Sequence, residues 1–93
     1  MKFILTFTWS PDTQTRAETI ARFQKTGGLP PKGAKLLGRW TRVDLSGGVD
    51  LLESDAPQAL AEFAWQWSDL MKMEIFPVLE DQELASVLQR VAQ

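Results

Sequence analysis

The feature that most constrains the fold is a central stretch, Ala34–Ser54, whose pattern indicates two strands joined by a tight turn. The turn signal is Ser46-Gly47-Gly48, which separates two runs of apolar and β-branched residues. Glycine reaches positive φ angles without steric cost, as short hairpin turns require. A hairpin of this kind needs cover on at least one face, so we expect the flanking segments to pack onto its sheet.

A two-residue loop at Ser46 and Gly47 predicts that Trp40 faces Glu53 across the hairpin. Gly38 inside the first strand predicts a β-bulge or the close approach of a helix, and a bulge exchanges the faces beyond it. With this register we expect the helix-covered face to hold Phe3, Leu5, Phe7, Leu36, Trp40, Val49, Leu51, Met73 and Ile75. The opposite face is expected to hold Ile4, Thr6, Thr8, Leu37, Arg39, Leu52, Glu74 and Phe76.

Each side of the hairpin carries one strand and one helix. The strict alternation of Lys2–Trp9 predicts a strand with one buried face. A helix follows, beginning at Asp12, Thr13 or Thr15 and ending at Gly27-Gly28, because glycine tolerates the left-handed conformation beyond a helix end.

After the hairpin, Asp55 is expected to cap a second helix with Pro57 in its first turn. Its core stripe is Leu60, Phe63, Ala64 and Trp67, which leaves Trp65 off the stripe. A strand is expected at Met71–Leu79, and a third helix at Asp81–Val91.

The order of elements predicts an α+β fold: a ferredoxin-like β-α-β-β-α-β antiparallel sheet with an added C-terminal helix, in a single domain over residues 1–93. The first strand should lie inside the sheet. The last should lie on an edge, because Pro77 cannot donate to a strand ladder.

Missing residue types exclude several chemistries. The chain has no His, Tyr or Cys, so His and Cys metal ligands, Ser-His triads, thiol nucleophiles and phenolic acids are all ruled out. We expect no metal, no cofactor and a cytoplasmic location. A net charge of −2 with no basic face argues against nucleic acid. No apolar run is long enough for a membrane span, and we expect no signal peptide.

Six residues are candidates for ligand binding. Trp9, Trp40 and Trp67 could line a pocket for a flat molecule, or they could be ordinary core aromatics. Arg39, Arg42 and Glu53 could orient a polar group, since a guanidinium offers a planar fork of donors. Arg42 with Glu53, or Arg39 with Glu74, could equally form salt bridges at a sheet rim or dimer seam.

The stretch ARFQKTGGLPPKGAKLLGRW, followed by GG, LLESDAP and WSDLMKMEIFPVLED, resembles a family of small bacterial proteins termed domain of unknown function 3303. The likeness runs from about Met1 to Asp81 and is most specific at Gly27-Gly28, Pro31 and Gly33, Gly38-Arg39-Trp40, Glu53, Trp67-Ser68-Asp69 and Pro77-Val78. The resemblance implies the dimeric α/β-barrel superfamily, which also contains cofactor-free monooxygenases. No motif here matches the catalytic residues of those oxygenases.

Three functions follow from these observations. We favour a module that binds a small planar or acidic molecule in a Trp-lined pocket between sheet and helices. The alternatives are a cofactor-independent oxygenase-like enzyme on an aromatic substrate, and a structural or protein-interaction module suggested by Trp65. We also expect a homodimer through the open sheet face, burying Thr6, Leu37, Leu52 and Phe76, because a single helix layer leaves that face uncovered.

Overall fold

The computed structural model describes residues 1–10 and 12–92, and its elements follow the predicted order. They are β1 (Lys2–Trp9), α1 (Thr13–Thr26), β2 (Ala34–Thr41), β3 (Gly47–Ser54), α2 (Pro57–Trp67), β4 (Met71–Val78) and α3 (Asp81–Val91). The strands form one antiparallel sheet in the order β2-β3-β1-β4. This confirms the ferredoxin-like α+β fold, with β1 inside and the Pro77 strand on an edge.

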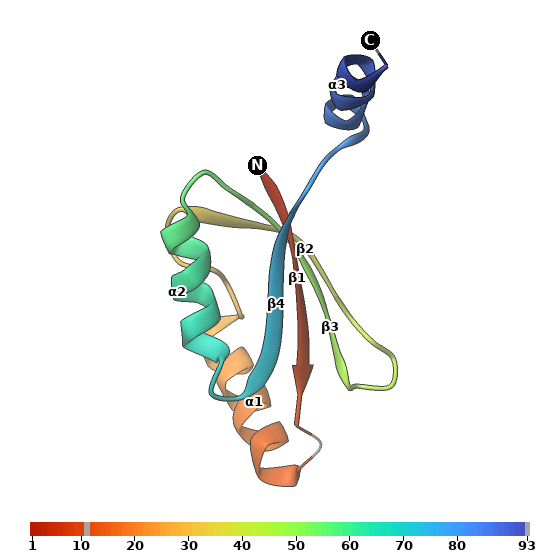
Figure 1. Ribbon diagram of the computed structural model, residues 1–93. Helices are drawn as coiled ribbons and strands as arrows, with labels where there is room; N and C mark the ends of the chain where they lie inside the picture. Colours follow the sequence, from red (N-terminus) through yellow and green to blue (C-terminus); the bar gives the residue numbers. More distant parts are fainter. Residues whose placement is uncertain (11, 93) are drawn as a thin grey trace.

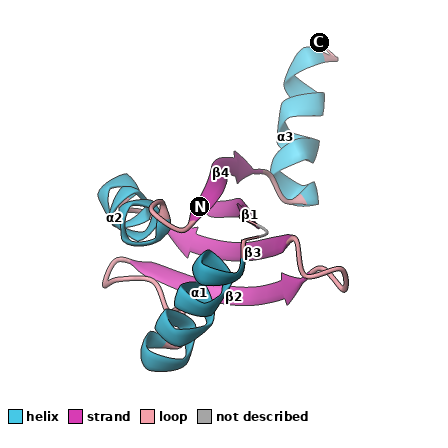
Figure 2. Ribbon diagram, turned by 90° about the horizontal axis from the view of Figure 1, so that it is seen from below, coloured by secondary structure: helices cyan, strands magenta, loops and turns pink. Residues whose placement is uncertain are grey.

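The helices α1 and α2 cover the same face of the sheet, and the other face is open (Figures 1 and 2). Between sheet and helices lies a core of residues from β1, β3, α2 and the turn that follows α2: Leu5, Phe7, Leu52, Leu60, Phe63, Trp67 and Leu70. The predicted stripe of α2 is therefore confirmed at its three largest members. Burial of these apolar side chains is the main force holding α2 to the sheet.

The third helix, α3, projects beyond the end of β4 and covers neither face of the sheet (Figure 1). None of its residues is buried. Its start is fixed by a capping box between Glu80 and Glu83 and by an ion pair between Lys2 and Glu80. In the described part of the chain, no helix is long and apolar enough to cross a membrane.

The helix ends follow the sequence at α1 and depart from it at α2. Asp12 caps α1 by accepting a 2.8 Å hydrogen bond from the Thr15 backbone, and Gly27 ends it in the left-handed conformation. The predicted cap of α2 by Asp55 is wrong. Ala56 occupies the N-cap position, and Asp55 points into solvent, 3.4 Å from the terminal amino group. Its neighbour Ser54 accepts the Ala56 backbone N–H instead.

The predicted two-residue hairpin loop is also wrong, because residues 42–46 form a five-residue loop. Leu45 takes the positive φ of the turn, at 61°. Gly47 belongs to β3, where a Cβ would lie 2.0 Å from the Phe7 carbonyl oxygen. This glycine serves the close approach of two strands, not the turn.

The longer loop moves the pairing, so that Trp40 faces Val49 and Glu53 faces Lys35. The expected Trp40–Glu53 pair does not form. The strands β1 and β4 keep their expected faces, but β3 and the part of β2 beyond Gly38 have their two faces exchanged. Val49, Leu51, Glu53 and Trp40 share the open face with Ile4 and Thr6, while Asp50 and Leu52 lie under the helices.

The bulge expected near Gly38 is confirmed and explains the reversal. The ladder shifts by one residue between Leu36 and Gly38, so Leu36 and Arg39 both lie on the helix-covered side despite their odd spacing. In an unbroken strand, Leu36 under the helices would have placed Trp40 there as well.

Candidate functional site

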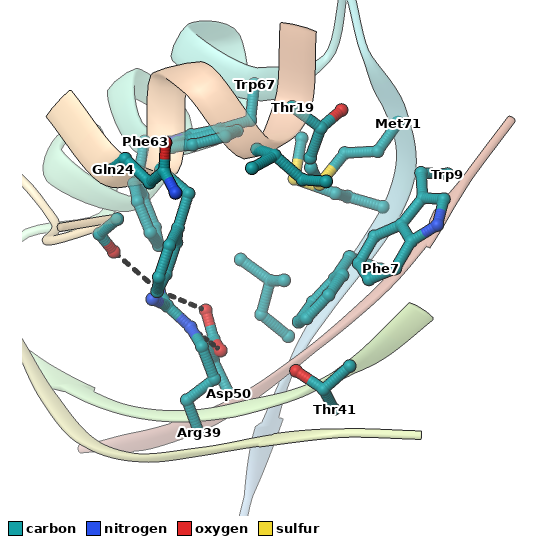
Figure 3. A pocket seen from close by; sticks show the side chains of 15 residues that line it. Phe7, Trp9, Thr19, Gln24, Arg39, Thr41, Asp50, Phe63, Trp67 and Met71 are labelled. Carbon is teal, nitrogen blue, oxygen red and sulfur yellow. Dashed lines mark hydrogen bonds and ion pairs between the residues drawn. The ribbon is translucent and has the colours of Figure 1, made fainter. Parts of the chain in front are cut away.

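A cavity of about 340 Å³ separates α1 from the sheet (Figure 3). Its wall is formed by residues of α1, α2 and all four strands, and most of these residues are apolar. The lining residues are Leu5, Phe7, Trp9, Thr19, Ile20, Phe23, Gln24, Gly28, Arg39, Thr41, Asp50, Phe63, Trp67, Met71 and Met73. This volume lies within the range of small-molecule sites in proteins.

One wall of the cavity carries a buried ion pair between neighbouring strands. Arg39 on β2 faces Asp50 on β3, and its Nε and Nη2 donate to the two carboxylate oxygens at 2.7 and 3.2 Å (Figure 3). The side chains are 18 % and 3 % exposed. A carboxylate so far from water requires a charged partner, and the fork of Arg39 provides it.

Arg39 also joins the sheet to the end of α1. Its Nη2 donates to the Gly28 carbonyl and its Nη1 to that of Gly27, at 3.4 Å. The guanidinium carbon lies 5.5 Å from the centre of the Phe23 ring, a cation–π distance. One side chain therefore binds the buried acid, two carbonyls and an aromatic ring.

A second arginine, on α1, forms hydrogen bonds with residues at the end of α2. Arg22 makes two hydrogen bonds to Asp69, at 2.8 and 2.9 Å, and a third to the Gln66 carbonyl at 2.7 Å. Its guanidinium carbon is 5.6 Å from the ring centre of Trp67. The hydrogen bonds from Arg22 lower the pKa of Asp69.

The end of the cavity away from the ion pair is aromatic. Phe7 and Trp9 stack with ring centres 5.7 Å apart, and Met71 pairs with Trp9 across the β1–β4 ladder. Asp50 pairs with Leu5, so Trp9 lies four residues further along β1, or about 13 Å. The ion pair and the stacked rings of Phe7 and Trp9 therefore line different parts of the cavity.

The roof of the cavity is formed by α1, which has no buried residue. Ile20 and Phe23 line the cavity yet remain 50 % and 46 % exposed. Because both side chains line the cavity, part of their apolar surface is available to a bound molecule.

Three of the six sequence candidates, Trp9, Arg39 and Trp67, line the cavity. The other three lie elsewhere. Trp40 is on the open face with its ring over Gly38, Arg42 pairs with Asp44 in the hairpin loop, and Glu53 is exposed. The suggested pairs of Arg42 with Glu53 and of Arg39 with Glu74 do not form.

Sequence reasoning missed Asp50 as a site residue. The acid beside the cavity was expected to be Glu53, because the two faces of the hairpin were assigned the wrong way round. The signal that could have identified Asp50 was Gly38: a bulge there, once assumed, places Arg39 and its cross-strand partner under the helices.

The described residues contain no group of three or more Asp and Glu side chains placed to hold a metal ion. Near the end of β4, Glu80 and Glu83 form the capping box of α3. These two acidic residues therefore stabilise the start of a helix.

The fold is shared with a known structure. Rv0793 from Mycobacterium tuberculosis aligns over 87 % of this chain and 98 % of its own, with a TM-score of 0.54 and 12 % sequence identity. At that identity the likeness concerns the fold alone. A comparison with curated proteins finds no match. The sequence model of one family, described as domain of unknown function (DUF3303), matches residues 1–92, and the chain therefore belongs to that family.

Proposed function

We propose that the protein binds a small, flat, largely apolar molecule in the cavity between α1 and the sheet. The observation that carries the proposal is the half-exposed apolar surface of Ile20 and Phe23 on the cavity wall. A bound molecule would remove this surface from water, which stabilises a complex by roughly 25 cal/mol for each Å² buried. Trp9 and Trp67 would supply aromatic contacts.

Binding has more support than catalysis. Asp50 is the one carboxylate among the described lining residues, and both its oxygens already accept hydrogen bonds from Arg39. A substrate would meet a paired acid rather than a free base, which weakens the oxygenase-like alternative. A protein-interaction role is favoured by Trp65, which is 80 % exposed and lies outside the cavity lining, so the two roles are compatible.

The proposal is tested with the neutral dye N-phenyl-1-naphthylamine, whose fluorescence increases in apolar sites. The bound dye can also be excited by energy transfer from tryptophan. We expect saturable binding by the wild type. Ile20→Glu, which puts a charge on the cavity wall, should weaken it about tenfold or more.

The matched control is Ala21→Glu, which adds the same charge one residue later on α1, outside the cavity lining. It should leave dye binding unchanged. Equal effects of the two substitutions would mean that the dye binds somewhere else, and the proposal would be rejected.

A further inference from the structure

The geometry points to a cavity that selects uncharged ligands carrying an N–H or O–H group and rejects anions. This inference rests on the proposed function, since it names the class of molecule bound at the same site. The sequence alone is compatible with either a planar or an acidic ligand, because it does not show which acids pair with the arginines.

The donors of Arg39 are nearly all used. A guanidinium has five N–H groups. Nε donates to Asp50 Oδ1, Nη2 to Asp50 Oδ2 and the Gly28 carbonyl, and Nη1 to the Gly27 carbonyl. These four bonds leave one N–H, so the two-donor fork that recognises a carboxylate or sulfonate is already occupied by Asp50.

The charges of the cavity cancel. Among the described residues that line it, Arg39 is the one cation and Asp50 the one anion. The nearby Arg22 is outside the lining and is bound by both oxygens of Asp69. An anionic ligand would therefore add an unbalanced negative charge next to a carboxylate that is 3 % exposed, which is strongly unfavourable away from water.

The remaining hydrogen-bonding capacity favours a donor on the ligand. An ionised carboxylate only accepts hydrogen bonds, and each oxygen of Asp50 accepts one from Arg39, which leaves lone pairs on both. A ligand N–H or O–H can use them. With that group at Asp50, the flat part of the molecule would extend along β1 toward the stacked rings of Phe7 and Trp9, of which Trp9 is about 13 Å away.

Two related dyes test this selection. N-phenyl-1-naphthylamine is neutral and carries one N–H, and 8-anilinonaphthalene-1-sulfonate is the same ring system with an added sulfonate. We expect the wild type to bind the neutral dye about tenfold or more tightly than the sulfonate. The Ile20→Glu variant shows whether each dye is bound in the cavity.

The substitution Asp50→Asn should reverse the preference. It removes one of the two acceptors that occupy the fork of Arg39 and leaves the cavity with a net positive charge, so the sulfonate should bind at least as tightly as the neutral dye. Asp44→Asn is the matched control: it makes the same change beside Arg42 in the exposed hairpin loop and should keep the wild-type preference. The double variant Arg39→Gln, Asp50→Asn removes both charges and should again reject the sulfonate.

The outcomes separate the two proposals. If Ile20→Glu weakens both dyes equally and the wild type binds them with equal affinity, the cavity binds ligands but the selection is refuted. An unchanged preference in folded Asp50→Asn protein refutes it as well. If Asp50→Asn does not fold, the wild-type preference alone decides. Insensitivity of both dyes to Ile20→Glu overturns the proposed function itself.

Discussion

At the scale of single residues, Gly28 fixes how closely the end of α1 approaches Arg39. It is buried and has a φ of 62°. A Cβ at this position would lie 2.5 Å from Arg39 Nη1 and 3.0 Å from the Phe23 ring. The absence of a side chain therefore lets the guanidinium reach the Gly27 and Gly28 carbonyls.

We predict that Gly28→Ala destabilises the protein more than Gly27→Ala. Both glycines have positive φ, so both substitutions should cost about 1–2 kcal/mol of backbone strain. Gly28→Ala should cost about 1–3 kcal/mol more, because Arg39 can make room only by leaving its partners. At Gly27 the nearest atom to a Cβ is 3.7 Å away, on Leu29. Urea denaturation measures the difference, and equal losses would contradict the prediction.

Which residues reach the cavity was only partly predictable from the sequence. Trp9 and Trp67 lie on elements with clear periodicity, so their inward direction followed from spacing alone. The direction of Trp40, Asp50 and Glu53 depends on the bulge and on which hairpin face receives the helices. Both faces carry leucines, so hydrophobicity does not decide between them. Pairing with β1 decides it, by setting Asp50 beside Leu5.

At the scale of elements, the stability of α1 depends on polar interactions as well as on apolar packing. It has no buried residue, and its contacts with the body include the bonds from Arg22 and Arg39. Its first turn is stabilised by Asp12, whose carboxylate accepts hydrogen bonds from the Ser10 hydroxyl and the Thr15 backbone. These bonds lower the pKa of Asp12 to about 2.

We predict that acid weakens α1 through this cap. The pKa of Asp12 is lowered in the folded protein from its usual 3.8, so its stabilisation is complete above about pH 4 and is lost as the pH falls toward 2. Asp12→Asn still caps a helix but does not titrate. Its melting temperature should therefore fall less than that of the wild type between pH 4 and pH 2. An equal fall in melting temperature for the two proteins would show that the cap contributes nothing to acid sensitivity.

The elements themselves were largely predictable, because each has a local period. The bounds of β1 and α3 match the sequence prediction, and α1 ends at the predicted glycine. The cap of α2 was not predictable by residue preference. Ser54, held by the Gly33 carbonyl at 2.6 Å, accepts the Ala56 N–H and leaves Asp55 facing solvent.

At the scale of the whole molecule, neither α1 nor α2 covers the open face of the sheet (Figure 2). Its register brings Ile4 beside Leu51 and Phe76, and Thr6 beside Val49. Leu52, expected in a dimer interface, is instead in the core. We propose that two copies of the protein pair through the open sheet face, because the apolar side chains of one copy would cover those of the other.

We predict that Phe76→Asp converts a dimer to a monomer. Phe76 is exposed on the open face, and a carboxylate there would be buried without a partner in the dimer. Light scattering at micromolar concentration should show the mass halved. Val43→Asp, a similar change at a fully exposed loop position, should leave the mass unchanged. A wild type that is already monomeric would end this proposal.

The bulge at Leu36–Gly38 also affects how relatives of this protein should be compared. Because the ladder skips one residue, Leu36 and Arg39 share a face across an odd spacing. A relative one residue shorter at Leu37 would keep both side chains under the helices in an unbroken ladder. A relative of equal length without the bulge would turn its arginine away from the cavity. Within the family, a gap at this position is therefore compatible with the ion pair, and an ungapped alignment does not by itself establish it.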